Sequence, residues 1–137
     1  KPAIVYFQTY NNNTKMISDL TNSNPDIFLD KELDIRKKNK LPPFQRFISL
    51  ILTGDDETKL EKEGYKFKNF IENRLTGKIL GPVNAPIFRI KKKFRVRLLI
   101  RGAKTLKLQN SLATAIPNYK FQPGIKLSVD VDPINFN

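Results

Sequence analysis

The sequence predicts an α+β fold, because strand-like and helix-like patterns alternate along the chain. Apolar and cationic side chains alternate over residues 94–100 with the period of two that is typical of a half-buried strand. A helix with one apolar face is expected after the acidic residues 55–57, and a second alternating strand lies in residues 125–133. Elements of both kinds in this order indicate a sheet with helices packed on it.

The N-terminal part is expected to form one strand and two helices. Ala3–Tyr10 is rich in β-branched and aromatic residues and predicts a buried strand, and Thr14–Leu20 predicts a short helix. Asn24 and Pro25 supply the N-cap and first residue of a longer helix that continues to about Lys38. Cations at its end complement the negative end of the helix dipole or contact phosphates. They are Arg36, Lys37, Lys38 and Lys40.

A domain boundary is expected at Leu41, because the two prolines that follow cannot continue a helix. We assign residues 1–40 to the end of one domain and residues 41–137 to a second. The chain begins with Lys and enters a strand-like run at once, so we expect a C-terminal piece of a larger protein. Beyond the boundary, apolar residues run almost without a break from Phe47 to Leu52, which predicts a central strand.

The next helix is expected to start at Asp55, Asp56 and Glu57, which suit the positive end of a helix. A glycine in mid-helix costs about 1 kcal/mol relative to alanine, so Gly64 predicts a close approach of this helix to the sheet. Gly77 is expected to close the element. The predicted buried face consists of Leu60, Gly64, Phe67 and Ile71.

Two strand-like segments between Ile79 and Arg101 meet at three lysines and predict a basic β-hairpin. In the second strand, apolar residues from Phe94 to Ile100 face the core and the arginines face away. In the first, Phe88 and Ile90 are expected to point inward. The cationic face is then suited to phosphates, with a solvated surface as the alternative. Its candidate residues are Arg89, Lys91, Lys92, Lys93, Arg95, Arg97 and Arg101.

A second helix, Ala103–Ile116, and a last strand, residues 125–133, complete the order βαββαβ from Phe44 onward. This order is that of the ferredoxin-like plait, an antiparallel four-stranded sheet with two helices on one face. The other face of the sheet is left free for binding.

Composition narrows the classes of function. The chain has 137 residues, 39% of them hydrophobic, and 25 Lys and Arg against 13 acidic residues, so its formal charge is +12. This excess favours nucleic acid or another polyanion as the partner, with a merely soluble lysine-rich protein as the alternative. The absence of Cys and His excludes thiol nucleophiles, disulfides, imidazole bases and the usual zinc sites. No run of apolar residues is long enough to span a bilayer, so we expect no membrane partner and a cytoplasmic location.

No catalytic or metal site is expected in this chain. Asp130 and Asp132 share a strand face and could form a metal or acid pair, but the sequence supplies no third ligand, base or nucleophile near them. The glycines are scattered and form no phosphate-cradling loop.

Three motifs resemble the C-terminal domain of the bacterial primosomal protein N′ (PriA) family of replication restart helicases. They are LPPF from Leu41, ILGPVNAPIFRIKKKFRVRLLI from Ile79, and LSVDVDP ending at Pro133. Upstream, IVYFQTY and the helix that leads into LPPF resemble the end of that family's second, RecA-like helicase lobe. The chain departs from the family at the hairpin turn, where Lys92 replaces a common glycine, and at Thr105, where an arginine is common.

The resemblance implies a parent that hydrolyses ATP, unwinds DNA with 3′ to 5′ polarity and reassembles the primosome. ATP, Mg²⁺ and Zn²⁺ are implied for the parent, and no cofactor for this chain. For this chain it implies binding of branched or single-stranded DNA, and a part in docking the acidic tail of single-stranded DNA-binding protein. We expect the docking on the second helix, at Lys104, Lys107 and Gln109, with ordinary surface residues as the alternative.

Two other classes share the predicted fold. A free-standing RNA-binding protein of ribosomal type has a similar plait and a similar basic charge. An acylphosphatase-like enzyme needs a phosphate-binding loop after the first strand, and the acidic residues 55–57 would repel phosphate there.

Overall fold

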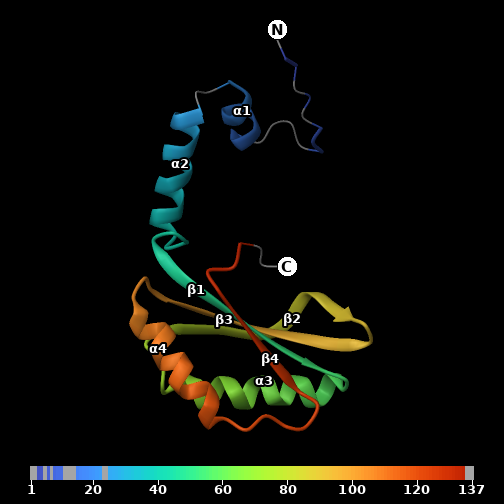
Figure 1. The fold of residues 1–137 in the computed structure, drawn as a ribbon. Coiled ribbons are helices and arrows are strands. Elements are labelled where there is room, and N and C mark those ends of the chain that lie inside the picture. Colours follow the sequence, from blue (N-terminus) through green and yellow to red (C-terminus); the bar gives the residue numbers. More distant parts are fainter. Residues whose placement is uncertain (1–2, 5, 7, 11–14, 23–24, 135–137) are drawn as a thin grey trace. The chain divides into compact units, whose positions relative to one another are not determined.

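The computed structural model describes residues 3–4, 6, 8–10, 15–22 and 25–134 (Figure 1). The chain divides into two compact units, Lys1–Asn39 and Lys40–Asn137. In the first unit, α1 (Lys15–Asn22) and α2 (Pro25–Lys38) are helices, as expected.

The strand expected at Ala3–Tyr10 is wrong for the described residues of that stretch, which adopt no strand. A strand needs a neighbour to pair its N–H and C=O groups, and the described residues of this unit supply none. Residues 5 and 7 lie outside the described residues, as do Thr14 and the expected cap Asn24.

The second unit has the predicted order βαββαβ, with a short 3₁₀ turn before the last strand. Its sheet has the strand order β2-β3-β1-β4, and each neighbouring pair is antiparallel, which is consistent with a ferredoxin-like plait. As expected, β1 is a central strand. The elements are β1 (Gln45–Gly54), α3 (Glu57–Glu72), β2 (Lys78–Ile90), β3 (Lys93–Ala103), α4 (Leu106–Ala115), η1 (Ile116–Asn118) and β4 (Lys126–Val131).

Local interactions set the ends of the helices. The carboxylate of Asp56 caps α3 by accepting a hydrogen bond from the backbone N–H of Lys59 at 2.9 Å. The helix ends at Glu72, earlier than predicted. The second helix begins at Leu106 instead of Ala103, because β3 continues its pairing with β1 up to Ala103.

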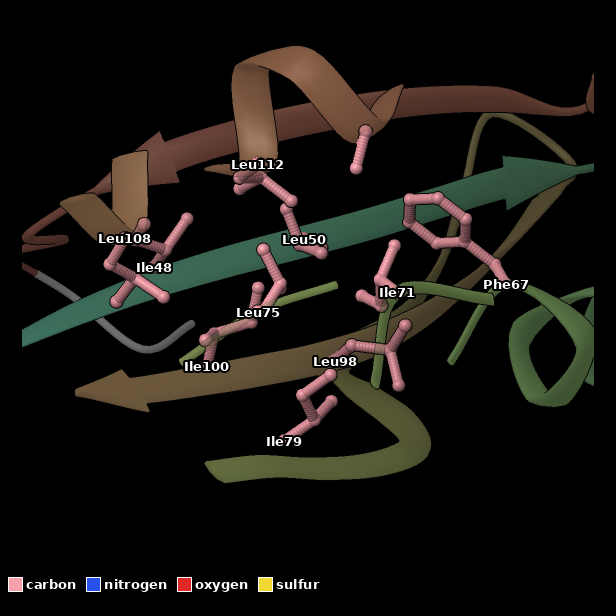
Figure 2. Packing of buried hydrophobic residues seen from close by; sticks show 11 residues of the cluster. Ile48, Leu50, Phe67, Ile71, Leu75, Ile79, Leu98, Ile100, Leu108 and Leu112 are labelled. Carbon is pink, nitrogen blue, oxygen red and sulfur yellow. The ribbon is translucent and has the colours of Figure 1, made fainter. Parts of the chain in front are cut away.

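The hydrophobic core lies between the sheet and its two helices. Figure 2 shows Leu50 of β1 beside Leu112 of α4, and Leu98 of β3 beside Ile71 of α3. The inward face predicted for β3 is confirmed, since Val96, Leu98 and Ile100 are all buried. Within the described part of the second unit, both helices pack on this one face, so neither α3 nor α4 covers the other face of the sheet.

The expected close approach at Gly64 is confirmed. A Cβ atom at this position would lie 3.1 Å from Cβ of Pro82 in β2 and 3.4 Å from a methyl group of Val96 in β3. Even a methyl group at this position would require Pro82 to shift by a few tenths of an ångström.

Glu63 on α3 is a buried acidic residue, at 1% exposure. Its Oε1 accepts hydrogen bonds from the Tyr119 hydroxyl at 3.1 Å and from the backbone N–H of Gln122 at 3.2 Å. The Tyr119 ring packs among Phe67, Phe70 and Phe121. Burial, and then the charge and hydrogen bond of Glu63, raise the pKa of Tyr119 to about 12. Glu63 thus ties the segment before β4 to α3.

Candidate nucleic-acid interface

The helix-free face of the sheet carries the predicted arginines of β3. Residues directly opposite one another in antiparallel strands share a face, and Arg95, Arg97 and Arg101 stand opposite Thr53, Ile51 and Phe47 of β1. None of these positions belongs to the helix-covered side. Lys78 of β2 stands opposite Arg101 and adds a fourth cation. We call Lys78, Arg95, Arg97 and Arg101 the arginine face.

The hairpin turn holds two of the three predicted lysines at its tip. Ile90 pairs with Lys93, so Lys91 and Lys92 form a two-residue turn, and both have positive φ, 49° and 67°. These values suit a type I′ turn, which favours Asn-Gly because L-residues resist positive φ. Both lysines are exposed. Lys93 instead forms an ion pair with Asp55 at 3.5 Å.

The strand β2 departs from the predicted alternation near its end. A register shift between Asn84 and Arg89 places Arg89 opposite Phe94 and so on the same face as Phe94. Its guanidinium lies 5.1 Å from the Phe94 ring centre, and the side chain remains exposed. The prediction that Arg89 joins the arginine face is therefore wrong, because the extra residues of a bulge shift the two-residue period. Ile90, expected to point inward, is 41% exposed.

Phe88 and Phe94 were also predicted to point inward. Phe94 packs against the small core cluster of Leu52, Leu60 and Val96, as expected. The Phe88 ring lies 5.4 Å from the Phe94 ring, so the two aromatic residues support each other across the hairpin.

Charge is distributed unevenly along the chain. No Asp or Glu stands between Glu72 and Asp130, a stretch that contains β2, β3 and α4. Residues 1–39 hold six cationic and five acidic side chains, so almost the whole positive excess belongs to the second unit. The sequence analysis missed this acid-free stretch, although it can be found by marking every acidic residue. The stretch gives the sheet a positive potential that attracts phosphates.

The three predicted docking residues lie around the start of α4: Lys104 precedes the helix, and Lys107 and Gln109 lie in its first turn. Lys104 and Lys107 are exposed, whereas Gln109 accepts a hydrogen bond through Oε1 from Nη1 of Arg46 at 2.6 Å. Arg46 also donates through Nε to Asp132 at 3.1 Å. Gln109 thereby takes part in linking β1 to α4 and to the end of β4.

The two aspartates at the end of β4 have different surroundings. Asp130 stands opposite Ser49 in the ladder, whereas Asp132 leaves the strand with a φ of 52°. Its Oδ1 accepts from the Phe47 N–H at 3.1 Å. Within the described residues there is no group of three or more side chains suited to hold a metal ion.

The described helices include none that is both long enough and apolar enough to cross a membrane.

Comparison with known proteins agrees with the resemblance found in the motifs. The family model described as primosomal protein N C-terminal domain matches residues 37–134. The replication restart protein PriA of Rickettsia typhi is 33% identical over 135 residues, covering 97% of this chain and 20% of that protein. The proteins of the same name from Borreliella burgdorferi and Bacillus subtilis are 26% and 25% identical, over 96% and 97% of this chain. The chain spans about a fifth of the length of these relatives. The chain belongs to the primosomal protein N C-terminal domain family.

Proposed function

We propose that this chain works as the C-terminal part of a replication restart protein in the bacterial cytoplasm and binds branched or single-stranded DNA through its arginine face. The observation that carries the proposal is that Arg95, Arg97 and Arg101 share the helix-free face of the sheet with Lys78, inside a stretch without acidic residues. Several cations on one open surface release counterions from a phosphate backbone when they bind it.

The arginine face favours phosphate contact over base reading. Phe94 is turned toward the core, and Phe47, the aromatic residue of β1 on the open face, is only 6% exposed. Without accessible aromatic rings, bases cannot stack on this part of the sheet as they do on RNA-recognition motifs. Binding here is therefore expected to be insensitive to sequence and sensitive to salt.

We also infer that the protein with this domain is an ATP-dependent DNA helicase with 3′ to 5′ polarity that works with other primosome proteins. ATP, Mg²⁺ and Zn²⁺ would be bound by its other parts, since this chain has no Cys or His and no phosphate-cradling glycine loop. Residues 1–40 would be the end of its second helicase lobe. In support, α2 has no buried residue, and four of its apolar side chains are exposed: Ile27, Leu29, Leu33 and Ile35.

The first turn of α4 is the proposed docking point for the acidic tail of single-stranded DNA-binding protein. Lys104, two residues before the helix, and Lys107 in its first turn are exposed, and acidic peptides pair with such cations. Gln109 follows within the same turn, with its Oε1 already bonded to Arg46.

The test is fluorescence anisotropy of the chain on forked DNA, single-stranded DNA and structured RNA across a salt series. The variant carries Arg95→Ala, Arg97→Ala and Arg101→Ala. A matched control removes three exposed lysines elsewhere, Lys62→Ala, Lys66→Ala and Lys120→Ala.

On duplex DNA, each phosphate contact contributes about 0.9 to the magnitude of the slope of log affinity against log salt concentration. The magnitude of this slope should fall by about 2–3 in the arginine variant and by much less in the control. Equal binding by the folded arginine variant and the parent chain would refute the assignment. Tighter binding of structured RNA than of any DNA would favour the ribosomal type of RNA-binding protein.

A further inference from the structure

The end of β2 carries a bulge that the proposed DNA contact does not use. Asn84 pairs with Val96 and Arg89 with Phe94, so residues 85–88 of β2 stand against the single residue Arg95 of β3. Such a surplus bends a strand out of its ladder. In Figure 1, β2 arches away from β3 in this region.

The bulge is fixed from three sides. Ala85 at its start is 4% exposed and anchors it to the body of the domain. At its end, the Phe88 ring lies 5.4 Å from the Phe94 ring. In the middle, Nη1 of Arg95 donates a hydrogen bond to the carbonyl of Ile87 at 3.2 Å. The backbone of residues 85–88 is therefore held in a defined shape.

This shape directs two neighbouring apolar side chains into solvent. Pro86 is exposed, and Ile87 is 50% exposed. Exposed cations follow at once along the chain, namely Arg89, Lys91 and Lys92. A single exposed isoleucine needs no explanation, but here a braced backbone presents a Pro-Ile pair beside three cations.

We propose that Pro86 and Ile87 form a wedge that packs against an unstacked base where a DNA duplex opens into single strands, while Arg89, Lys91 and Lys92 contact the flanking phosphates. Proline and isoleucine are among the side chains that other proteins insert at base steps. A closed duplex offers phosphates but no free base face, whereas a junction offers both. The inference rests on the proposed DNA binding and adds the DNA structure that the hairpin recognises.

The experiment places 2-aminopurine, whose fluorescence rises on unstacking, at the junction of a forked DNA and also inside a fully paired duplex. The full chain is compared with Ile87→Ala and with Ile87→Gln, which keeps the size of the side chain but makes it polar. Val129→Ala on β4, where the side chain is 44% exposed, is the matched control.

The parent chain and the Val129 control should raise the fluorescence at the fork and not in the duplex. Both Ile87 variants should lose this rise and bind the fork about fivefold more weakly, with duplex affinity unchanged. Unchanged fluorescence and fork preference in both variants would overturn the wedge while leaving the arginine face intact.

Two other outcomes would overturn the wedge. An absence of salt-dependent DNA binding by the parent chain would remove the proposed function together with the wedge. Competition between DNA and an acidic peptide that depends on Ile87 would assign the bulge to a protein partner instead.

Discussion

The two faces of the sheet come from the same strands but have opposite characters. On β3, Leu98 is fully buried under the helices, and the next residue, Leu99, lies on the open face between two arginines. One residue along the strand separates a side chain that stabilises the fold from one that borders the proposed binding surface. Substitutions on the two faces should therefore affect stability and binding independently.

The sharpest test of this independence is the pair Leu98→Ala and Leu99→Ala. Leu98 is in the core cluster, so its truncation leaves a cavity and should lower the free energy of unfolding by about 3–4 kcal/mol. Leu99 is partly exposed, and its truncation should cost less than about 1 kcal/mol. Urea unfolding of both variants measures the difference. Equal losses would mean that the open face is covered in solution.

The second largest loss of stability is expected at Gly81, where the pairing of β2 with β3 is irregular beside the arginine face. Its φ is 95°, and a Cβ atom would lie 2.7 Å from the carbonyl oxygen of Arg97. Gly81→Ala should cost about 2–3 kcal/mol, through positive φ and the clash together. Gly124→Ala is the control, because its φ is 87° but nothing lies within 4 Å of a Cβ there. Gly124→Ala should lower the free energy of unfolding by about 1 kcal/mol. Similar losses in both variants would show that the backbone near Gly81 moves to relieve the clash.

The smallest effect is a pH dependence confined to the helix-covered side. The raised pKa of Tyr119, about 12 against 10.0, means that the folded chain keeps a proton that the unfolded chain loses first. The stabilisation from this group is present below pH 10 and is lost as the pH rises toward 12.

Tyr119→Phe should cost about 1 kcal/mol at neutral pH through the lost hydrogen bond to Glu63, and should weaken the alkaline loss of stability. Tyr65→Phe, at a 50% exposed position, is the control. Urea midpoints measured on both sides of pH 10 give the answer, and an alkaline loss that is the same in both variants would contradict the assignment to Tyr119.

The sequence alone predicted which face each side chain occupies where two strands pair without a register shift. β1 and β3 pair without interruption from Gln45 to Gly54, so simple alternation placed Val96 and Arg97 on the correct faces. It failed at Arg89, because a bulge changes the face of every residue beyond it and no local pattern marks the number of extra residues. The same limit hid the wedge at Pro86 and Ile87.

Helix periodicity did not predict the buried carboxylate of α3. It identified the apolar face of α3 but not Glu63, since a carboxylate inside that face becomes favourable only through donors more than fifty residues away, at Tyr119 and Gln122. In the first unit, the composition of residues 3–10 favoured a strand, but strand formation also requires a pairing partner that composition does not show.

The acid-free stretch between Glu72 and Asp130 has a consequence for how salt acts on the free chain. Its cations repel one another across the sheet, so added salt should make the folded chain more stable by screening them. The same salt would weaken the proposed binding to DNA. A bound phosphate backbone would supply the missing negative charge and stabilise the folded state by linkage. If the domain binds DNA as proposed, the nucleic acid would also act as a counterion that stabilises the folded chain.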